Sequence, residues 1–388
     1  MSRKLRVAHL IRSLDLGRLG GGAEIFAIAL IQSLTNECEQ MLAVIKHTNS
    51  AIEEKWINDL EKFNVKTVFL QDNDQLKPAM GLRRLVQVTK CWKPDILHTH
   101  CQVGALYSII IRLFSKSPKI LRTIHTSLEW GKGPLPQLLR ITLSAVIFPI
   151  VYDAQVGVSQ TIAYKSGNTI GSKLAGRSTY YIPNALRREW LDKCSPNQWG
   201  AIQANHRPVI GTAGRLTTHK GYEDLITAFK KVLDIIPEAR LWIIGDGELR
   251  TALELQVEKL KIREQVVFWG QRDDVLEILK GMDLFILASL SEGLPTVILE
   301  SMACGVPVIA TEIPGNTELV FDGQTGWLTP THNPEMLAKN ICHALQTPSE
   351  RQRIRLNAAK QLDKFSITSI AIQYKKIYSQ LCNDQLLT

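Results

Sequence analysis

Paired cysteines, long apolar runs and a complete dinucleotide fingerprint are all missing from this chain of 388 residues. Its seven cysteines are scattered and form no Cys-x-x-Cys pair, which favours reduced thiols and argues against a zinc site. The longest apolar run, 141–151, is too short to cross a bilayer. His9 and Arg12 interrupt the core that a signal peptide would need. We therefore expect a cytoplasmic protein that is neither disulfide-rich nor membrane-spanning.

Length and composition predict two globular domains. A chain of 388 residues exceeds what one hydrophobic core supports, and its hydrophobic (45%) and charged (21%) fractions are ordinary. The net charge of +9 is uneven, because residues 1–200 hold 26 Lys/Arg against 15 Asp/Glu, whereas residues 201–388 hold 20 against 22. The basic half either attracts anions, such as lipid headgroups or a phosphorylated acceptor, or is a solvated surface without a partner. Nucleic acid is disfavoured, because no segment interleaves basic and aromatic residues.

Apolar runs and helical segments alternate along both halves, which is typical of doubly wound parallel sheets. We predict an α/β protein of two Rossmann-like domains that face each other across a cleft. Periodicity breaks between Arg187 and Pro208, which places the domains at 1–195 and 196–366, with a closing helical segment at 367–388. The predicted strands are 7–11, 41–45, 67–70, 96–98, 120–124 and 154–158, then 209–213, 240–244, 266–269, 283–288 and 308–310.

Two carboxylates eight positions apart, Glu292 and Glu300, flank the point where a predicted strand becomes a helix. The preceding run is apolar, as in a strand buried on both faces, and Pro295 suits the first turn of the helix. Gly293 and Leu294 leave backbone N–H groups near the helix N-terminus, which suits a phosphate. Either Glu taken alone would be interpreted as an ordinary exposed carboxylate, Glu292 on the surface and Glu300 on the helix.

Cations and glycines follow other predicted strands of the second half. Gly214 precedes Arg215, which offers a fork of donors, and Lys220, which offers a mobile charge. Together the two cations could neutralise a diphosphate, although an ordinary surface loop is the alternative. Gly245 opens a Gly-Asp-Gly segment that lacks the third glycine of a dinucleotide site, so it is weak evidence for NAD. Arg272 ends a further strand and could frame a nucleobase.

The first half carries glycine and histidine motifs, again where predicted strands end. Gly21 and Gly22 form the entry to the first helix. His98 and His100 would point to one face of a continuing strand, but no third ligand stands at a telling spacing, so no metal site is expected. His125 is either a hydrogen-bonded structural histidine or a substrate contact.

Five motifs in order between Gly211 and Pro330 resemble those of glycosyltransferase family 4. They are Gly-Arg-Leu-x-x-x-Lys-Gly, Gly-Asp-Gly, the Glu-Gly-Leu-Pro segment with its Glu-x7-Glu pair, Met-Ala-Cys-Gly-Val-Pro-Val-Ile-Ala-Thr, and Asp-Gly-x-Thr-Gly-Trp-Leu. The resemblance implies the GT-B fold, a retaining, nucleotide-sugar-dependent activity and a closing helix that returns to the first domain. Residues 182–186 depart from the Asn-Gly-Val-Asp of many relatives, which puts a contact from that loop in doubt.

The resemblance also implies a role for each matching residue. Arg215 and Lys220 would bind the donor diphosphate, and Glu300 the ribose hydroxyls. Glu292 would hold the donor sugar with the Gly293 and Leu294 backbone, and His125 would lie beside the anomeric centre. The candidate catalytic residues are Arg215, Lys220, Glu292 and His125, and the candidate donor-binding residues are Gly21, Gly22, Gly214, Arg215, Lys220, Gly245, Arg272, Glu292, Gly293, Leu294, Pro295, Thr296 and Glu300.

The residue types fit this chemistry. Cleavage of a sugar–phosphate bond places negative charge on the departing diphosphate, so cations and N–H groups at that position stabilise the transition state. We expect no cofactor and no metal, and we name no nucleophile, since none is established in the family. Our first expectation for the donor is UDP-glucose, followed by GDP-mannose. For the acceptor we expect a saccharide or lipid-linked saccharide of an envelope or exopolysaccharide, met by peripheral contact with the inner, anionic face of the membrane.

Three alternatives stay open. A UDP-sugar epimerase shares the fold and the donor but needs more acid/base groups, and product analysis separates the two. A nicotinamide-dependent enzyme is disfavoured by the incomplete glycine fingerprint. A sugar-nucleotide-binding protein without catalysis would keep Arg215 and Glu300 yet release no nucleotide.

Overall fold

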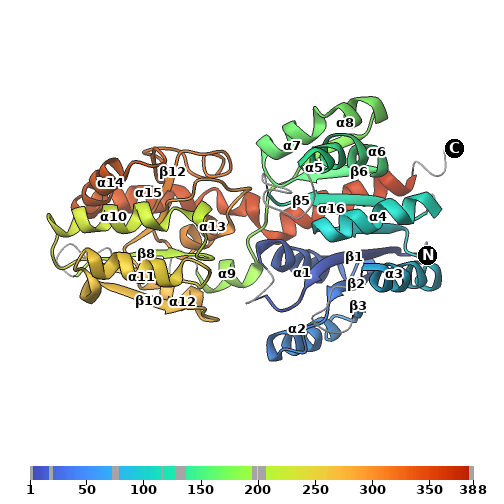
Figure 1. Ribbon diagram of the computed structural model, residues 1–388, viewed down its shortest axis with the longest axis horizontal. Coiled ribbons are helices and arrows are strands. Elements are labelled where there is room, and N and C mark those ends of the chain that lie inside the picture. Colours follow the sequence, from blue (N-terminus) through green and yellow to red (C-terminus); the bar gives the residue numbers. More distant parts are fainter. Residues whose placement is uncertain are drawn as a thin grey trace. The chain divides into compact units, whose positions relative to one another are not determined.

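The computed structural model describes residues 3–16, 21–71, 78–114, 117–126, 137–194, 199 and 207–383. The chain divides into two compact units, and it passes twice between them. Residues 1–185 and 367–388 form the first unit, and residues 186–366 form the second. Figure 1 shows the strands of each unit with helices packed around them.

The first unit is built on a parallel sheet with the strand order β3-β2-β1-β4-β5-β6-β7. Its strands are apolar runs such as Val7–Ile11, which are almost entirely buried. The strands are β1 Leu5–Ser13, β2 Cys38–Lys46, β3 Lys66–Gln71, β4 Ile96–Thr99, β5 Lys119–Ile124, β6 Ala154–Gly157 and β7 Ser178–Tyr181. The helices are α1 Gly22–Leu34, α2 Ala51–Glu61, α3 Pro78–Trp92, α4 Gln102–Phe114, α5 Gln137–Thr142, α6 Phe148–Val151, α7 Gln160–Gly167, α8 Ile170–Ala175 and α16 Ile367–Asn383, with a π-helical turn at Leu143–Ile147.

The second unit repeats this plan with the strand order β10-β9-β8-β11-β12-β13, again parallel. Its strands are β8 Val209–Ala213, β9 Arg240–Ile244, β10 Val266–Gly270, β11 Leu284–Leu287, β12 Val308–Thr311 and β13 Trp327–Thr329. Its helices are α9 Arg188–Lys193, α10 Tyr222–Leu233, α11 Arg250–Lys259, α12 Val275–Lys280, α13 Thr296–Ala303, α14 Pro334–Gln346 and α15 Pro348–Ala359, with short 3-10 turns at Thr218–Lys220, Arg263–Gln265 and Leu362–Phe365.

The C-terminal helix α16 belongs to the core of the first unit. Ile370, Tyr374 and Tyr378 are fully buried in one cluster with Val7 of β1 and Phe26 of α1. In Figure 1 the red α16 accordingly lies among the blue and green elements of that unit.

The predicted class, an α/β protein with two doubly wound parallel sheets, is confirmed. The prediction missed β7 and β13, because β7 is polar and only partly buried, and β13 has only three residues. The unit boundary lies after Ala185, before the predicted residue 195. The reason is that Leu186 donates its N–H to the Phe365 carbonyl at 2.7 Å, which joins these residues to the second unit.

Candidate functional site

The second sheet changes its winding direction at β8, which pairs with β9 on one side and with β11 on the other. At such a switch point the loops after the two central strands diverge, and the space at the carboxyl ends of the strands is open to a ligand. The loop after β8 carries Arg215 and Lys220, and the loop after β11 carries Glu292. The strand order thus brings together motifs that are far apart in the sequence.

Lys220 and Glu292 form an ion pair across this switch point, 72 positions apart in the chain. The Lys220 ammonium lies 2.6 Å from Glu292 Oε1, and the two side chains are only 17% and 11% exposed. Ser289 donates its hydroxyl to the same carboxylate oxygen at 2.6 Å. Because the two side chains are partly buried, water screens the attraction between their charges less than it would at the surface. The pair therefore holds the Lys220 ammonium near the N-terminus of α13 more firmly than a surface ion pair would.

The loops around this pair approach so closely that two positions require glycine. Gly221, with φ +66°, precedes α10, and an added Cβ would lie 2.0 Å from the Ala288 carbonyl oxygen. Gly245, with φ +125°, follows β9, and its Cβ would lie 2.0 Å from the Gly214 carbonyl oxygen. Leu290 also donates its N–H to the His219 carbonyl at 2.7 Å. The backbone of the three loops is therefore held as one block.

Helix α13 begins beside Glu292 without a side-chain cap. Pro295 occupies the N-cap position with extended backbone, so the helix starts at Thr296, one residue later than predicted. Gly293 and Leu294 are buried. Since no side chain caps the first turn, its N–H groups and the positive end of the helix dipole can act on an anion at this edge of the sheet.

Glu300 lies inside α13, on the second turn. Burial raises the pKa of its carboxyl group, while the Arg187 charge and a hydrogen bond with Thr296 act in the opposite direction. Arg187 lies just before α9, and its guanidinium pairs with Glu189 at 2.6 Å. The sequence prediction did not include Arg187, because its proximity to Glu300 depends on the packing of α9 against α13.

The remaining predicted cations are placed differently from one another. Arg215 is exposed and forms no ion pair with any residue that the structure describes. Arg272 is instead engaged by Asp274 through two hydrogen bonds of 2.7 and 2.6 Å, and its guanidinium lies 5.6 Å from the Trp269 ring centroid. Arg215 is the cation available to a phosphate, whereas Arg272 would have to exchange partners to contact a base.

Sequence reasoning missed two further groups at this edge. The pKa of His219 is lowered by partial burial and by the neighbouring Lys220. Tyr222 is 2% exposed, and burial raises its pKa. Both residues flank Lys220 and Gly221 in the sequence. This position next to a predicted site residue could have indicated them as members of the site.

In the first unit, the predicted glycines and His125 also follow strands. Gly21 caps α1, and its N–H donates to Glu24 Oε2 at 2.9 Å. His125 follows β5 and packs edge-on against Phe26, with ring centroids 5.4 Å apart. Burial lowers the pKa of His125 to about 4, and the Asn184 side chain acts in the opposite direction. His125 is therefore a neutral imidazole at pH 7.

The pair His98 and His100 gains a third histidine that the sequence did not indicate, His9 of β1. Both ring nitrogens of His9 form hydrogen bonds, one with Gln40 at 3.0 Å and the other with His100 at 3.1 Å. His98 likewise bonds Tyr378 and Thr123, both at 2.8 Å. Burial lowers the pKa of all three imidazoles, so they are neutral at pH 7. Hydrogen bonds thus engage both ring nitrogens of His9 and of His98, whereas Nδ1 of His100 has no hydrogen-bond partner among the described residues. The expectation of no metal stays a prediction.

Comparison with known proteins identifies the family. Residues 199–361 match the model of the glycosyl transferases group 1. An uncharacterized glycosyltransferase of Methanocaldococcus jannaschii is 30% identical over 339 residues, which cover 83% of this chain and 87% of that protein. The chain belongs to the group 1 glycosyltransferases. Several other relatives match this glycosyltransferase over only 43 to 50% of their own length.

Two further similarities concern proteins with named ligands or substrates. An N,N'-diacetylbacillosaminyl-diphospho-undecaprenol alpha-1,3-N-acetylgalactosaminyltransferase of Campylobacter jejuni is 25% identical over 382 residues, covering 94% of this glycosyltransferase and 98% of the relative. The crystal structure of Anabaena HepE in complex with UDP-glucose matches with a TM-score of 0.78 and 21% identity, covering 97% and 100% of the two chains. The structural match shows that the glycosyltransferase has the GT-B fold.

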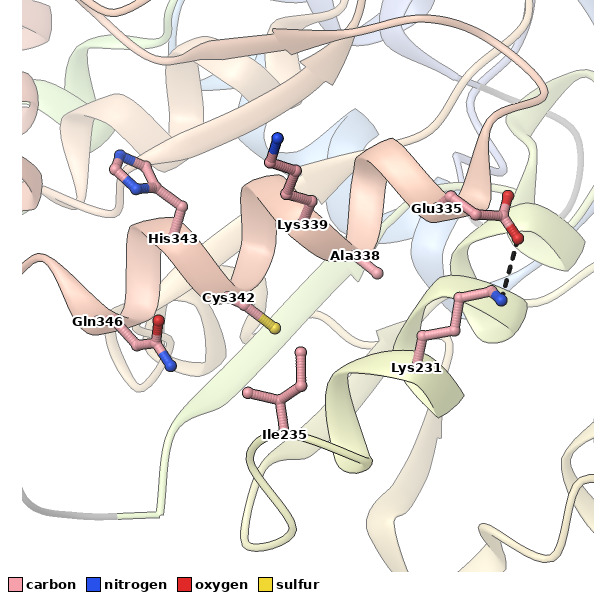
Figure 2. A pocket seen from close by; sticks show the side chains of 8 residues that line it. All are labelled: Lys231, Ile235, Glu335, Ala338, Lys339, Cys342, His343 and Gln346. Carbon is pink, nitrogen blue, oxygen red and sulfur yellow. Dashed lines mark ion pairs between the residues drawn. The ribbon is translucent and has the colours of Figure 1, made fainter.

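A separate hollow of about 400 Å³ lies between α10 and α14, as Figure 2 shows. None of the predicted site residues lines it, and two of its lining residues, Lys231 and Glu335, form an ion pair of 2.9 Å. The hollow therefore shares no residue with the candidate site at the switch point. No helix among the described residues is long and apolar enough to span a membrane.

Proposed function

We propose that this glycosyltransferase is a retaining enzyme that moves a hexose from a nucleotide diphosphate sugar, with UDP-glucose as the first choice, to a saccharide or lipid-linked acceptor of envelope or exopolysaccharide synthesis. The observation that carries the proposal is the Lys220–Glu292 ion pair beside the uncapped N-terminus of α13. This edge of the sheet combines a cation for the phosphates, a carboxylate for sugar hydroxyls and a helix N-terminus that no side chain caps.

Each residue has a role in this proposal. Arg215 and Lys220 neutralise the diphosphate as the sugar–phosphate bond breaks, together with the first-turn N–H groups of α13. Glu292 accepts hydrogen bonds from the sugar, and its contact with Lys220 fixes both groups before the donor binds. Glu300 accepts hydrogen bonds from the ribose. These groups stabilise charge without supplying a nucleophile, and we propose that neither a metal nor another cofactor is required.

The choice of donor and acceptor rests on similarity and on charge. The Anabaena structure contains UDP-glucose, and the Campylobacter relative is named for a diphospho-undecaprenol acceptor. Residues 1–200 carry eleven more basic than acidic side chains, which suits an anionic acceptor or an anionic surface that holds it. We propose that acceptor-binding residues lie in the first unit.

Calorimetric titration of the protein with a panel of nucleotide sugars tests the donor. We expect one UDP-hexose to bind at least tenfold more tightly than the corresponding GDP-sugar. Incubation of that donor with lipid-linked saccharides should then release UDP and form an α-linked product, with activity retained after dialysis against EDTA. Tighter binding of a GDP-sugar would refute the donor assignment. Conversion of the donor into its epimer, without transfer, would favour an epimerase.

A further inference from the structure

Two buried thiols meet in the second unit, 110 positions apart in the chain. The Sγ atoms of Cys194 and Cys304 are 3.2 Å apart, and the two residues are only 4% and 6% exposed. Neither thiol has a role in the proposed transfer reaction. The contact is closer than two sulfur atoms need for simple packing, so it calls for a chemical explanation.

The backbone already holds the two cysteines in position. Cys194 follows the last turn of α9, and Cys304 follows the last turn of α13. The Trp199 indole N–H is shared between the carbonyl of Cys194, at 3.2 Å, and that of Ala303, at 2.9 Å, so one side chain ties the two helix ends together. Since a disulfide bond is about 2.05 Å long, the sulfur atoms need to approach by only about 1 Å.

We propose that Cys194 and Cys304 form an oxidation site that a peroxide converts reversibly into a disulfide. Sulfur of one cysteine, as thiolate, attacks a peroxide oxygen; the O–O bond breaks, and a sulfenic acid and hydroxide form. The second sulfur then attacks the sulfenic sulfur, the S–S bond forms and the S–O bond breaks, releasing water. In total two thiols and one hydrogen peroxide give one disulfide and two waters.

The surroundings distinguish the two sulfur atoms. The hydrogen bond between the two thiols lowers the pKa of Cys194. The same bond and burial raise the pKa of Cys304. Cys194 is therefore the thiolate that meets the peroxide, and Cys304 is the resolving cysteine.

Oxidation would act on the proposed donor site through α13. Cys304 donates its backbone N–H to the Glu300 carbonyl at 3.1 Å, so a shift of Cys304 toward α9 displaces the turn that carries Glu300. Loss of positioning weakens binding, and we expect UDP to bind the oxidised protein roughly three- to tenfold more weakly. This consequence rests on the proposed function, whereas the disulfide itself does not.

Peptide mapping of the full chain without reductant, before and after hydrogen peroxide treatment, tests the proposal. We expect a linked pair of peptides containing Cys194 and Cys304, two mass units lighter than the free peptides and lost again with dithiothreitol. The oxidised protein should melt roughly 5–10 °C higher, since the bond closes a long loop. Cys304→Ser should form no link, while Cys91→Ser, which removes an exposed thiol, should form it as the wild type does.

The result that overturns the proposal is complete oxidation of exposed Cys91 while Cys194 and Cys304 remain free thiols. A link of either cysteine to a different partner would also overturn it. Cys194→Ala and Cys304→Ala, compared in the reduced state, show whether the thiols merely fill space. If the link forms and UDP affinity is unchanged, the oxidation site stands and its coupling to the donor site is rejected.

Discussion

At the scale of single residues, the site depends on partly buried charges. Lys220 and Glu292 neutralise each other at 2.6 Å, so each can be withdrawn from water. Glu300 is less well compensated, because burial outweighs the effect of Arg187 on its pKa. This difference gives the two carboxylates separate responses to mutation and to pH.

Lys220→Ala should weaken the binding of UDP and of the donor roughly 10- to 100-fold, the range for losing a hydrogen bond to a charged group. The change also leaves Glu292 partly buried beside the phosphates without its cation. Calorimetry with UDP provides the measurement. Lys230→Ala is the matched control, because Lys230 also lies on α10 and its ion pair with Asp234 is at the surface. Equal affinities in the two variants would contradict the assignment.

Glu300→Gln should make stability less dependent on pH. The folded-state pKa of Glu300 is raised, so the folded protein holds a proton that the unfolded chain releases at lower pH. Ionisation of Glu300 therefore lowers stability as pH rises from the ordinary Glu value through the raised one, and no such loss occurs below the ordinary value. Melting temperatures of both proteins between pH 4 and pH 8 provide the check. A steeper loss in the variant would refute the assignment.

At the scale of elements, tight loops and one long helix support the site. The loops after β8, β9 and β11 approach within backbone contact, which only glycine permits at Gly221 and Gly245. In the first unit, Tyr374 and Tyr378 of α16 anchor the strand ends, since Tyr378 bonds His98 and Tyr374 bonds Thr123. Thr123 lies two residues before His125, so α16 supports the segment that carries it.

Gly221→Ala should lower the free energy of unfolding by about 3 kcal/mol or more, because the added Cβ meets a carbonyl oxygen and the left-handed backbone is strained as well. Gly270→Ala is a close control, because Gly270 has φ +68° and its Cβ would meet nothing within 4 Å. That variant should lose only about 1–2 kcal/mol. Urea denaturation of both measures the difference, and equal losses would show that the close approach is unimportant.

Tyr378→Phe should cost about 1–3 kcal/mol of stability, because it leaves a buried nitrogen of His98 without its partner. Tyr180→Phe is the control, since the Tyr180 hydroxyl donates to Gln380 at the surface, over a long distance of 3.4 Å. Denaturation curves of the two variants and the wild type measure the free energies of unfolding. A loss in Tyr378→Phe no larger than in the control would mean that the network contributes little.

At the scale of the whole molecule, charge is divided between the halves of the chain, +11 in residues 1–200 and −2 in residues 201–388. Basic side chains that gather on one surface would be attracted to acidic lipid, at about 1 kcal/mol per basic residue near the membrane. The proposed lipid-linked acceptor would be met there.

The full chain should float with vesicles that contain anionic lipid at low salt, and this binding should weaken severalfold at 0.5 M salt, because ions screen the attraction. Neutral vesicles serve as the control. Protein that stays in solution with anionic vesicles at low salt would count against membrane contact, and equal binding to neutral vesicles would rule out an electrostatic cause.

The sequence by itself determined where the buried apolar strands lie, because the apolar runs of parallel strands are local patterns, but it did not indicate β7 and β13. It also placed Arg215, Lys220 and Glu292 in loops that follow strands, and Glu300 in the helix after Glu292. It could not determine the boundary at Ala185, which depends on the pairing of Leu186 with Phe365.

Only the tertiary structure decided which side chains meet. The winding order β9-β8-β11 brought Lys220 to Glu292, and the pairing of β1 with β4 brought His9 to His98. The packing of α9 on α13 placed Arg187 near Glu300 and Cys194 against Cys304. The physical reason is that strand order and helix packing arise from burial of surface across the whole unit, whereas periodicity and motif spacing report only on neighbouring residues.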